Sequence, residues 1–78
     1  MSTFPGNYLQ ALAAAMRQRR LQQKLTQEQV AELADLSANY FARIERGEIN
    51  LTFEKVVRIA YALNIKPSAL LKSAEKRL

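Results

Sequence analysis

The fold is decided in the stretch TQEQVAELADLSANYFARIERG, residues 26–47, where two helix starts follow in close succession. Thr26 can cap a helix, and Gln29, three residues later, can bond back to the Thr26 backbone N–H. Ser37 can cap a second helix, and Gly47 can end it, because glycine readily adopts the left-handed conformation of helix ends. The stretch therefore predicts two short helices joined by a tight turn.

Three further helices are predicted on either side of this stretch. A helix that Asn7 begins as N-cap, ending near Gln23, carries apolar residues at helical spacing: Leu9, Leu12, Ala13, Met16 and Leu21. Thr52 caps another, whose apolar residues are Phe53, Val56, Ile59, Ala60 and Leu63. Asn64 suits the left-handed position behind it, and Pro67 begins a last helix. The prediction is an all-α domain of five helices over residues 7–74, with an irregular lead-in at 1–6 and a tail at 75–78.

Composition narrows the classes of function. The 78 residues include no cysteine and no histidine, which argues against disulfides, a zinc site and the usual catalytic nucleophiles and bases. The longest apolar run, Leu12–Met16, is too short to cross a membrane, and residues 1–6 lack the basic and apolar segments of a signal peptide. We therefore expect a cytoplasmic protein that is not an enzyme, with no cofactor, no metal and no membrane partner.

The charge balance favours a polyanionic partner. Twelve lysines and arginines against seven acidic residues give a formal net charge of +5. The basic residues gather in three groups: Arg17, Arg19, Arg20 and Lys24; Arg43 and Arg46; and Lys72, Lys76 and Arg77. Arg17 and Arg19 have two possible interpretations, contact with phosphate or a place on a solvated helix face. Lys55 and Arg58 are expected to face solvent.

The helix that follows Ser37 has two different faces. On a helical wheel, one side holds Phe41, Ile44 and Glu45, and the other holds Ala38, Asn39, Ala42, Arg43 and Arg46. The second side carries no carboxylate. Asparagine can pair bidentately with adenine and arginine with guanine. A lone helix of this kind would be interpreted as an ordinary solvated one, but the preceding short helix and tight turn favour a helix-turn-helix that enters the major groove.

These residues resemble the phage-repressor and Cro (XRE) family of helix-turn-helix proteins. The resemblance is carried by Thr26-Gln27-Glu28-Gln29-Val30-Ala31, Leu36-Ser37, Tyr40-Phe41-Ala42-Arg43-Ile44-Glu45-Arg46-Gly47, Asn50-Leu51-Thr52 and Ile59-Ala60-Tyr61-Ala62-Leu63. It implies a lambda-repressor-like domain with the helix-turn-helix at about 26–46 and the recognition helix at 37–46. The implied function is sequence-specific binding of double-stranded DNA by a dimeric transcriptional regulator. The small size and the lack of a second domain resemble the controller proteins of restriction–modification systems. Stand-alone phage regulators and antitoxins are built in the same way and stay open as alternatives.

The resemblance also implies roles for individual residues. Base-reading positions are Ser37, Ala38, Asn39 and Arg43. Phosphate contacts are implied for Gln27, Arg46 and Asn50, to which position alone adds Tyr40 and Arg17. Tyr40 lies at the edge of the face, where it can touch a phosphate or pack on the core. Arg20 and Glu45 match a mostly buried structural ion pair. Lys24 and Asp35 stand where the family often has glycine, so positive φ would strain Lys24 more than Asp35.

Dimerisation and other partners rest on a few surface residues. One recognition helix spans few base pairs, whereas a two-fold dimer reads half-sites about 34 Å apart in a pseudo-palindromic operator. Candidate interface residues are Tyr61, Ile65, Leu71 and Leu78, for which completion of the core is an equal alternative. Glu28 and Glu32 are candidates for recruiting RNA polymerase. Outward-facing Leu33 keeps open a second function, that of an antitoxin or other protein-interaction module.

Overall fold

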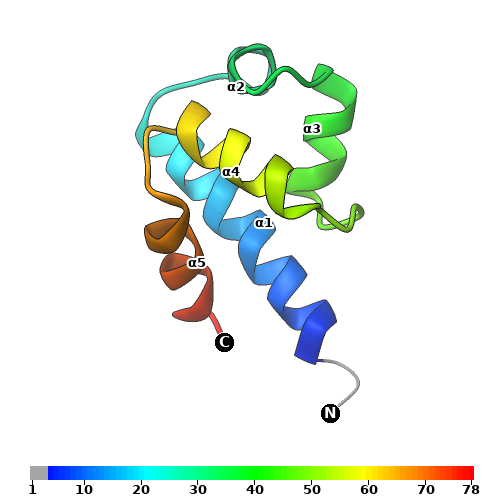
Figure 1. The fold of residues 1–78 in the computed structure, drawn as a ribbon, viewed down its shortest axis with the longest axis vertical. Helices are drawn as coiled ribbons and strands as arrows, with labels where there is room; N and C mark the ends of the chain where they lie inside the picture. The colour runs from blue at the N-terminus through cyan, green and yellow to red at the C-terminus, as the bar shows by residue number, and fades with distance from the viewer. Residues whose placement is uncertain (1–3) are drawn as a thin grey trace.

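Five helices follow one another along residues 4–78, which are the residues described by the structure, a computed structural model (Figure 1). In chain order they are α1 (Phe4–Gln22), α2 (Gln27–Leu33), α3 (Ala38–Glu45), α4 (Phe53–Ala62) and α5 (Pro67–Glu75). Each is joined to the next by a short turn or loop. The predicted all-α, five-helix fold is confirmed.

The predicted caps begin α2, α3 and α4. The Thr26 hydroxyl accepts from the Gln29 N–H at 3.0 Å, and the Gln29 side chain accepts from the Thr26 N–H at 2.8 Å, which completes a capping box. The Ser37 hydroxyl accepts from the Tyr40 N–H at 3.1 Å. Thr52 caps α4 in the same way. Because each cap satisfies a backbone N–H that has no partner inside the helix, these side chains fix where each helix starts.

The start of α1 differs from the prediction. The helix begins at Phe4, so Asn7 lies inside it and is not its N-cap, and the irregular lead-in does not extend to residue 6. Proline is tolerated in the first helical turn, where its missing N–H would have no partner anyway. Pro5 therefore does not block a helix that starts one residue before it. Residues 1–3 of the predicted lead-in lie outside the described part of the chain.

Four residues adopt the left-handed conformation behind the helices: Lys24 (φ 59°), Asp35 (φ 60°), Gly47 (φ 73°) and Asn64 (φ 57°). Glycine suits position 47 because of its positive φ, and a Cβ there would lie 2.5 Å from the Gln10 side-chain nitrogen, a contact that the flexible end of this exposed side chain can relieve by moving. The predictions for Gly47 and Asn64 are confirmed, and Lys24 does take the strained positive φ.

Two arginines hold the backbone at two of these turns. Arg58 of α4 donates to the carbonyl oxygens of Ala34 and Asp35 at 2.7–2.9 Å. Arg19 of α1 donates to the carbonyl oxygens of Leu63 and Asn64 at 3.0 and 2.7 Å. The expectation that Arg58 faces solvent is therefore wrong, and Arg19 is engaged in structure. Carbonyl groups at the ends of α2 and α4 lack helical partners, and the guanidinium donors satisfy them.

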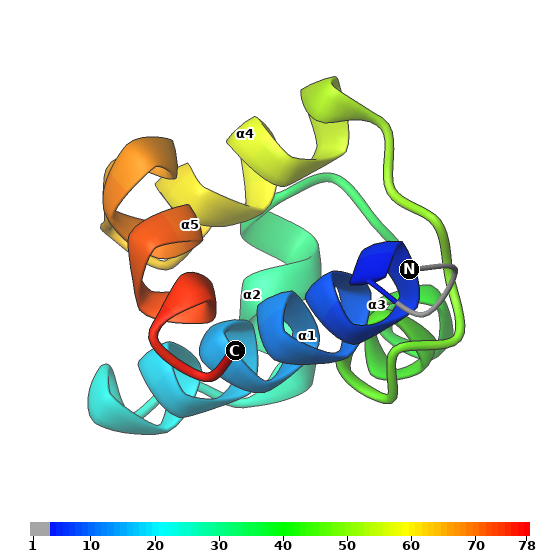
Figure 2. The ribbon, with the colours of Figure 1, turned by 90° about the horizontal axis from the view of Figure 1, so that it is seen from below.

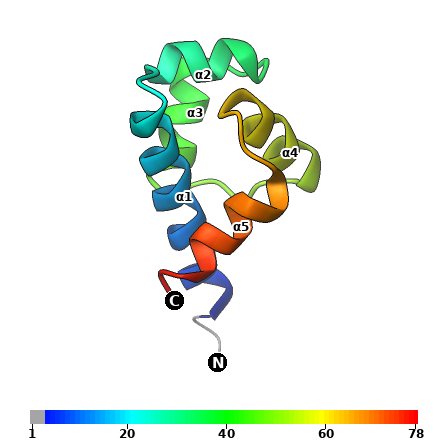
Figure 3. The same cartoon turned by 90° about the vertical axis from the view of Figure 1, so that its left-hand side faces the viewer.

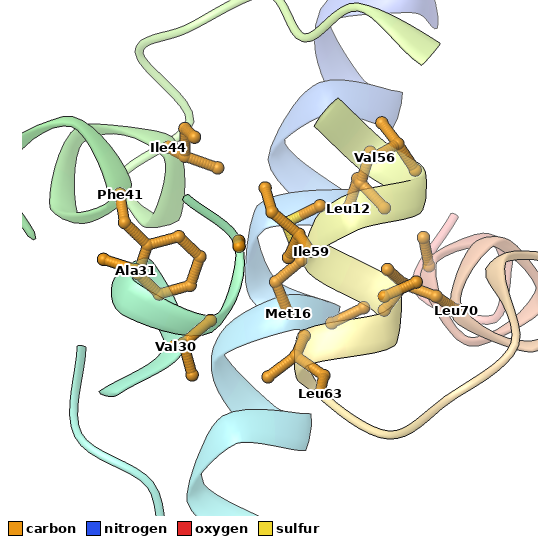
Figure 4. Packing of buried hydrophobic residues seen from close by; sticks show 14 of the residues in the cluster. Leu12, Met16, Val30, Ala31, Phe41, Ile44, Val56, Ile59, Leu63 and Leu70 are labelled. Carbon is orange, nitrogen blue, oxygen red and sulfur yellow. The ribbon is translucent and has the colours of Figure 1, made fainter. Parts of the chain in front are cut away.

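All five helices contribute to one hydrophobic core. The largest fully buried side chains are Phe41, Met16, Ile44, Ile59, Leu63, Leu70 and Val30, and most of them meet in Figure 4. Two predicted members are exposed instead. Leu21 follows the inward-pointing Arg20 and so points away, and Phe53 belongs to the first turn of α4, which projects from the bundle (Figure 2). The helical spacing of apolar residues therefore predicted which face of each helix is apolar, but it did not predict which residues of that face extend beyond the core.

The arrangement of the helices leaves one side of α3 open. α2 lies across one end of the molecule, beside α3 (Figure 3). α5 packs along α1 on the opposite side of the bundle from α3 (Figures 1 and 2). The C-terminal end stays with α1, where Arg77 hydrogen-bonds Gln18. The tail therefore does not cover the outward face of α3.

Candidate nucleic-acid interface

The outward face of α3 is built by burying its other face. Phe41 and Ile44 are fully buried, which turns Asn39 and Arg43 into solvent. The side chain of Arg43 is 53% exposed. Ala38 is half-buried, so the first turn of α3 offers little bulk beside Asn39. This arrangement gives an exposed amide and an exposed guanidinium one turn apart, on a helix with small neighbours.

A buried ion pair fixes the orientation of α3. Arg20 of α1 donates from Nε to Glu45 Oε2 at 2.7 Å and from Nη2 to Oε1 at 3.1 Å, which is the two-bond fork of a guanidinium with a carboxylate. Its Nη1 donates to the Leu25 carbonyl at 3.0 Å. The side chains of Arg20 and Glu45 are only 10% and 3% exposed. The structure thus brings together the two residues that the resemblance paired.

Gln27 joins the same carboxylate from the start of α2. Its Nε2 donates to Glu45 Oε1 at 2.8 Å, so Glu45 binds side chains from α1 and α2 while it belongs to α3. The half-buried Gln27 side chain thereby braces α3. Because one amide N–H is used in this contact, the second amide N–H and the backbone N–H at the start of α2 are what Gln27 can donate to a phosphate.

Sequence reasoning missed Glu48, which lies just beyond α3. Arg46 donates from Nε to Glu48 Oε2 at 2.8 Å, and Arg43 Nε lies 3.4 Å from Glu48 Oε1. The hydrogen bond from Arg46 is the main cause that holds the pKa of the exposed Glu48 carboxyl below its usual value. The helical wheel predicted an outward surface without carboxylates. The structure shows that this surface includes the Glu48 carboxylate. The only sequence signal for this contact was the order Arg46-Gly47-Glu48. That order does not show that the chain turns back toward α3 and brings Glu48 beside Arg43.

The other candidate phosphate contacts lie around α3 in different settings. Tyr40 is half-buried and packs against the core, and the Lys55 Nζ lies 5.1 Å from the centre of its ring. Asn50 is exposed in the loop between α3 and α4. Arg17 is exposed on α1, where it makes no ion pair with any residue between 4 and 78. We call the exposed Asn39, Arg43 and Arg46 the recognition surface. Tyr40 on α3 and Asn50 in the loop behind it lie near this surface in the chain, whereas Arg17 belongs to another helix.

The candidate dimer residues are only partly brought together. Tyr61 and Ile65 line an open pocket with Asn64 and Lys66 at the end of α4. Tyr61 is 72% exposed, whereas Leu71 is half-buried against the core. Leu78 is exposed at the C-terminal end. The alternative of core completion therefore describes Leu71 and also Ile65, which is half-buried against the core, while Tyr61 and Leu78 remain available at the surface.

The remaining candidate residues for partner contacts lie on the surface of α2. Glu28, Glu32 and Leu33 are all exposed on α2. Over residues 4–78, no three His, Cys, Asp or Glu side chains gather closely enough to hold a metal ion. None of the helices within these residues has the length and apolar character needed to span a bilayer.

Comparison with known proteins gives one consistent result. A family model described as helix-turn-helix matches residues 16–70. The immunity repressor of Bacillus phage phi105 is 45% identical over 51 residues, which are 65% of this chain and 35% of the repressor, so the chain spans about a third of that relative. The control protein C.SmaI of Serratia marcescens is 38% identical over 60 residues, 77% of this chain and 71% of that protein. Among solved structures, the clp gene regulator ClgR of Corynebacterium glutamicum has a TM-score of 0.86 at 28% identity, covering 88% of this chain and 73% of that one.

Proposed function

Because this chain belongs to the XRE-type helix-turn-helix family of DNA-binding transcriptional regulators, we propose that it binds a specific operator as a homodimer. In this proposal α3 enters the major groove of double-stranded DNA and Asn39 and Arg43 read base edges. The observation that carries the proposal is the exposure of Asn39 and Arg43 on a helix whose opposite face is fully buried. Ser37 and Ala38 approach the bases from the first turn of the same helix.

Affinity in this proposal comes from contacts to the sugar–phosphate backbone. Gln27 at the start of α2, Arg46 and Asn50 behind α3, and Tyr40 at its edge surround the reading residues. Arg17 adds positive charge from α1. Phosphate contacts position the protein and make binding depend on salt, whereas base contacts supply the preference for one sequence.

Regulation follows from occupancy of the operator. A bound dimer can block RNA polymerase, or recruit it through the exposed Glu28 and Glu32 on α2. The likeness to C.SmaI supports a role as the controller protein of a restriction–modification system. Since its ligand is chromosomal or phage DNA, we place the protein in the cytoplasm.

Selection of bound sites from random duplex DNA tests the proposal directly. We expect a pseudo-palindromic motif whose two halves are separated by one helical turn, about 34 Å. Arg43→Ala should relax the preference at one base pair per half-site, by roughly 1–3 kcal/mol. Arg77→Ala is the matched control, because it removes the same charged group from the exposed C-terminal end and should leave the motif unchanged.

Two outcomes would overturn this function. Enrichment of no motif would show that α3 does not read sequence. Recovery of a stoichiometric protein partner that is lost on Leu33→Asp, combined with weak DNA binding, would support the interaction module instead, since Leu33 is 64% exposed on α2.

A further inference from the structure

Glu48 contacts the two arginines of the recognition surface in different ways. Arg46 presents the side of its guanidinium, with Nε 2.8 Å from Oε2 and Nη2 3.5 Å from Oε1. Arg43 contributes only its Nε, 3.4 Å from Oε1. All three side chains are about half exposed, at 45–58%. The carboxylate is therefore shared unequally, with Arg46 as its main partner.

The contact with Arg46 occupies the atoms that would bind a phosphate. Guanidinium forks bind carboxylate and phosphate oxygens with the same parallel N–H geometry. With Nε and Nη2 directed at Glu48, Arg46 must exchange one anion for another when DNA arrives. The pair is exposed, so the exchange is inexpensive, but the net gain from an Arg46–phosphate contact is reduced.

The contact with Arg43 leaves the reading atoms free. Arginine can recognise guanine through two N–H groups that point at O6 and N7. Because Glu48 touches Arg43 only at Nε, the terminal Nη1 and Nη2 are not engaged by it. The carboxylate can therefore stay in place and brace Arg43 while the end of the guanidinium meets a base.

We propose that Glu48 is a specificity-determining residue, which weakens the contact of Arg46 with DNA phosphates while it holds Arg43 in position to read guanine. The inference rests on the proposed function and adds a role for a residue outside α3. The hydrogen bond from Arg46 lowers the pKa of the Glu48 carboxyl further below neutral pH, where a glutamate is already charged. Binding to DNA of any sequence gains less from the Arg46 phosphate contact, whereas binding to the operator also gains a positioned base contact.

Glu48→Gln separates these two effects. Binding is measured by fluorescence anisotropy over a salt series, with the selected operator and with a random-sequence duplex. Affinity for the random duplex should rise about three- to tenfold, and the slope of log K against log salt should steepen by about one unit. Operator affinity should change less, because the freed Arg46 and the unbraced Arg43 act in opposite directions. The ratio of the two affinities should therefore fall.

Glu75→Gln controls for net charge. It neutralises an exposed glutamate at the end of α5, on the far side of the bundle from α3 (Figure 1), and it should leave the affinity ratio unchanged. In an Arg46→Gln background, Glu48→Gln should no longer raise affinity for the random duplex, because the residue through which it acts is gone. Thermal unfolding followed by circular dichroism verifies that each variant is folded.

Three results would overturn the role of Glu48. They are equal gains on both duplexes, a gain that matches that of Glu75→Gln, and a gain that persists in the Arg46→Gln background. Failure of the proposed function has a different signature, since it would leave wild type with no preferred duplex. The dependence of random-duplex affinity on Glu48 and Arg46 would still be measured in that case and would decide whether Glu48 weakens the phosphate contact of Arg46, whereas the role of Glu48 at Arg43 would fall with the proposed function.

Discussion

At the scale of single residues, Glu45 is the side chain on which the recognition helix depends. Arg20→Met would leave this buried carboxylate without its cationic partner, and we expect the free energy of unfolding to fall by about 3–5 kcal/mol. Gln27→Ala removes only one hydrogen bond to Glu45 and should cost about 1 kcal/mol. Urea denaturation of the two variants checks this ranking, and similar losses in both would contradict it.

Glu48 gives a second residue-scale prediction, which concerns pH. Its carboxylate is stabilised in the charged form, chiefly by the hydrogen bond from Arg46, so its pKa in the folded protein lies below the ordinary value. The pairing is therefore complete above the unfolded-state pKa and is lost as pH falls through the lowered folded-state value. A titration followed by the Glu48 side-chain carbonyl carbon in NMR spectra should show this low midpoint. In Arg46→Gln the midpoint should rise, and an unchanged midpoint would exclude Arg46 as the cause.

These two carboxylates also show what could be predicted residue by residue. Glu45 and Arg20 are 25 positions apart, and no spacing rule joins them. The resemblance to a family supplied the pair. Glu48 had no such precedent, and its position three residues beyond Glu45, where α3 ends, depends on how Gly47 turns the chain. A helical wheel ends with the helix, so it could not place Glu48 beside Arg43.

At the scale of elements, the turns that precede α2 and α3 carry a measurable strain. Lys24 and Asp35 both have φ near 60°. Lys24→Gly should raise the free energy of unfolding by up to about 1 kcal/mol, because the strain it relieves exceeds the entropy that glycine adds to the unfolded chain. Asp35→Gly should be nearly neutral, since aspartate tolerates this conformation better. Thermal unfolding of both variants checks the difference, and a larger gain at Asp35 would contradict the assignment of strain.

The element scale is also where the sequence was most informative. Caps at Thr26, Ser37 and Thr52 lie where local hydrogen bonding requires them, because a cap acts within three residues of its own position. Arg58 was assigned to solvent because its role is set by α2, which is distant in sequence but adjacent in space. Local signals therefore predicted the elements, whereas contacts between elements required the structure.

At the scale of the whole molecule, packing decides which apolar residues remain available for a partner. Helical spacing assigned both Phe53 and Leu63 to one apolar stripe of α4, yet Phe53 is 75% exposed and Leu63 is fully buried. The difference in exposure depends on where neighbouring helices end. The apolar pattern of one helix does not contain that information. Tyr61 raises the question of which exposed residues form the dimer interface. An interface residue must be exposed in the monomer, but exposure alone does not show that Tyr61 lies in an interface.

The two exposed aromatic residues of α4 allow that question to be answered by a matched pair of variants. Tyr61 lies near the end of the helix, beside Ile65 in the open pocket, and Phe53 lies at its start. If the pocket forms the two-fold interface, Tyr61→Asp should place a charge in it and shift sedimentation toward the monomer. Phe53→Asp introduces the same charge into an equally exposed position and should leave self-association unchanged, since aspartate is also favoured in a first helical turn.

Operator affinity should then fall steeply for Tyr61→Asp at protein concentrations where wild type is dimeric, because two half-sites must be held together in register. Wild-type association in both variants would move the interface away from α4, and association lost only in Phe53→Asp would place it at the opposite end of the helix.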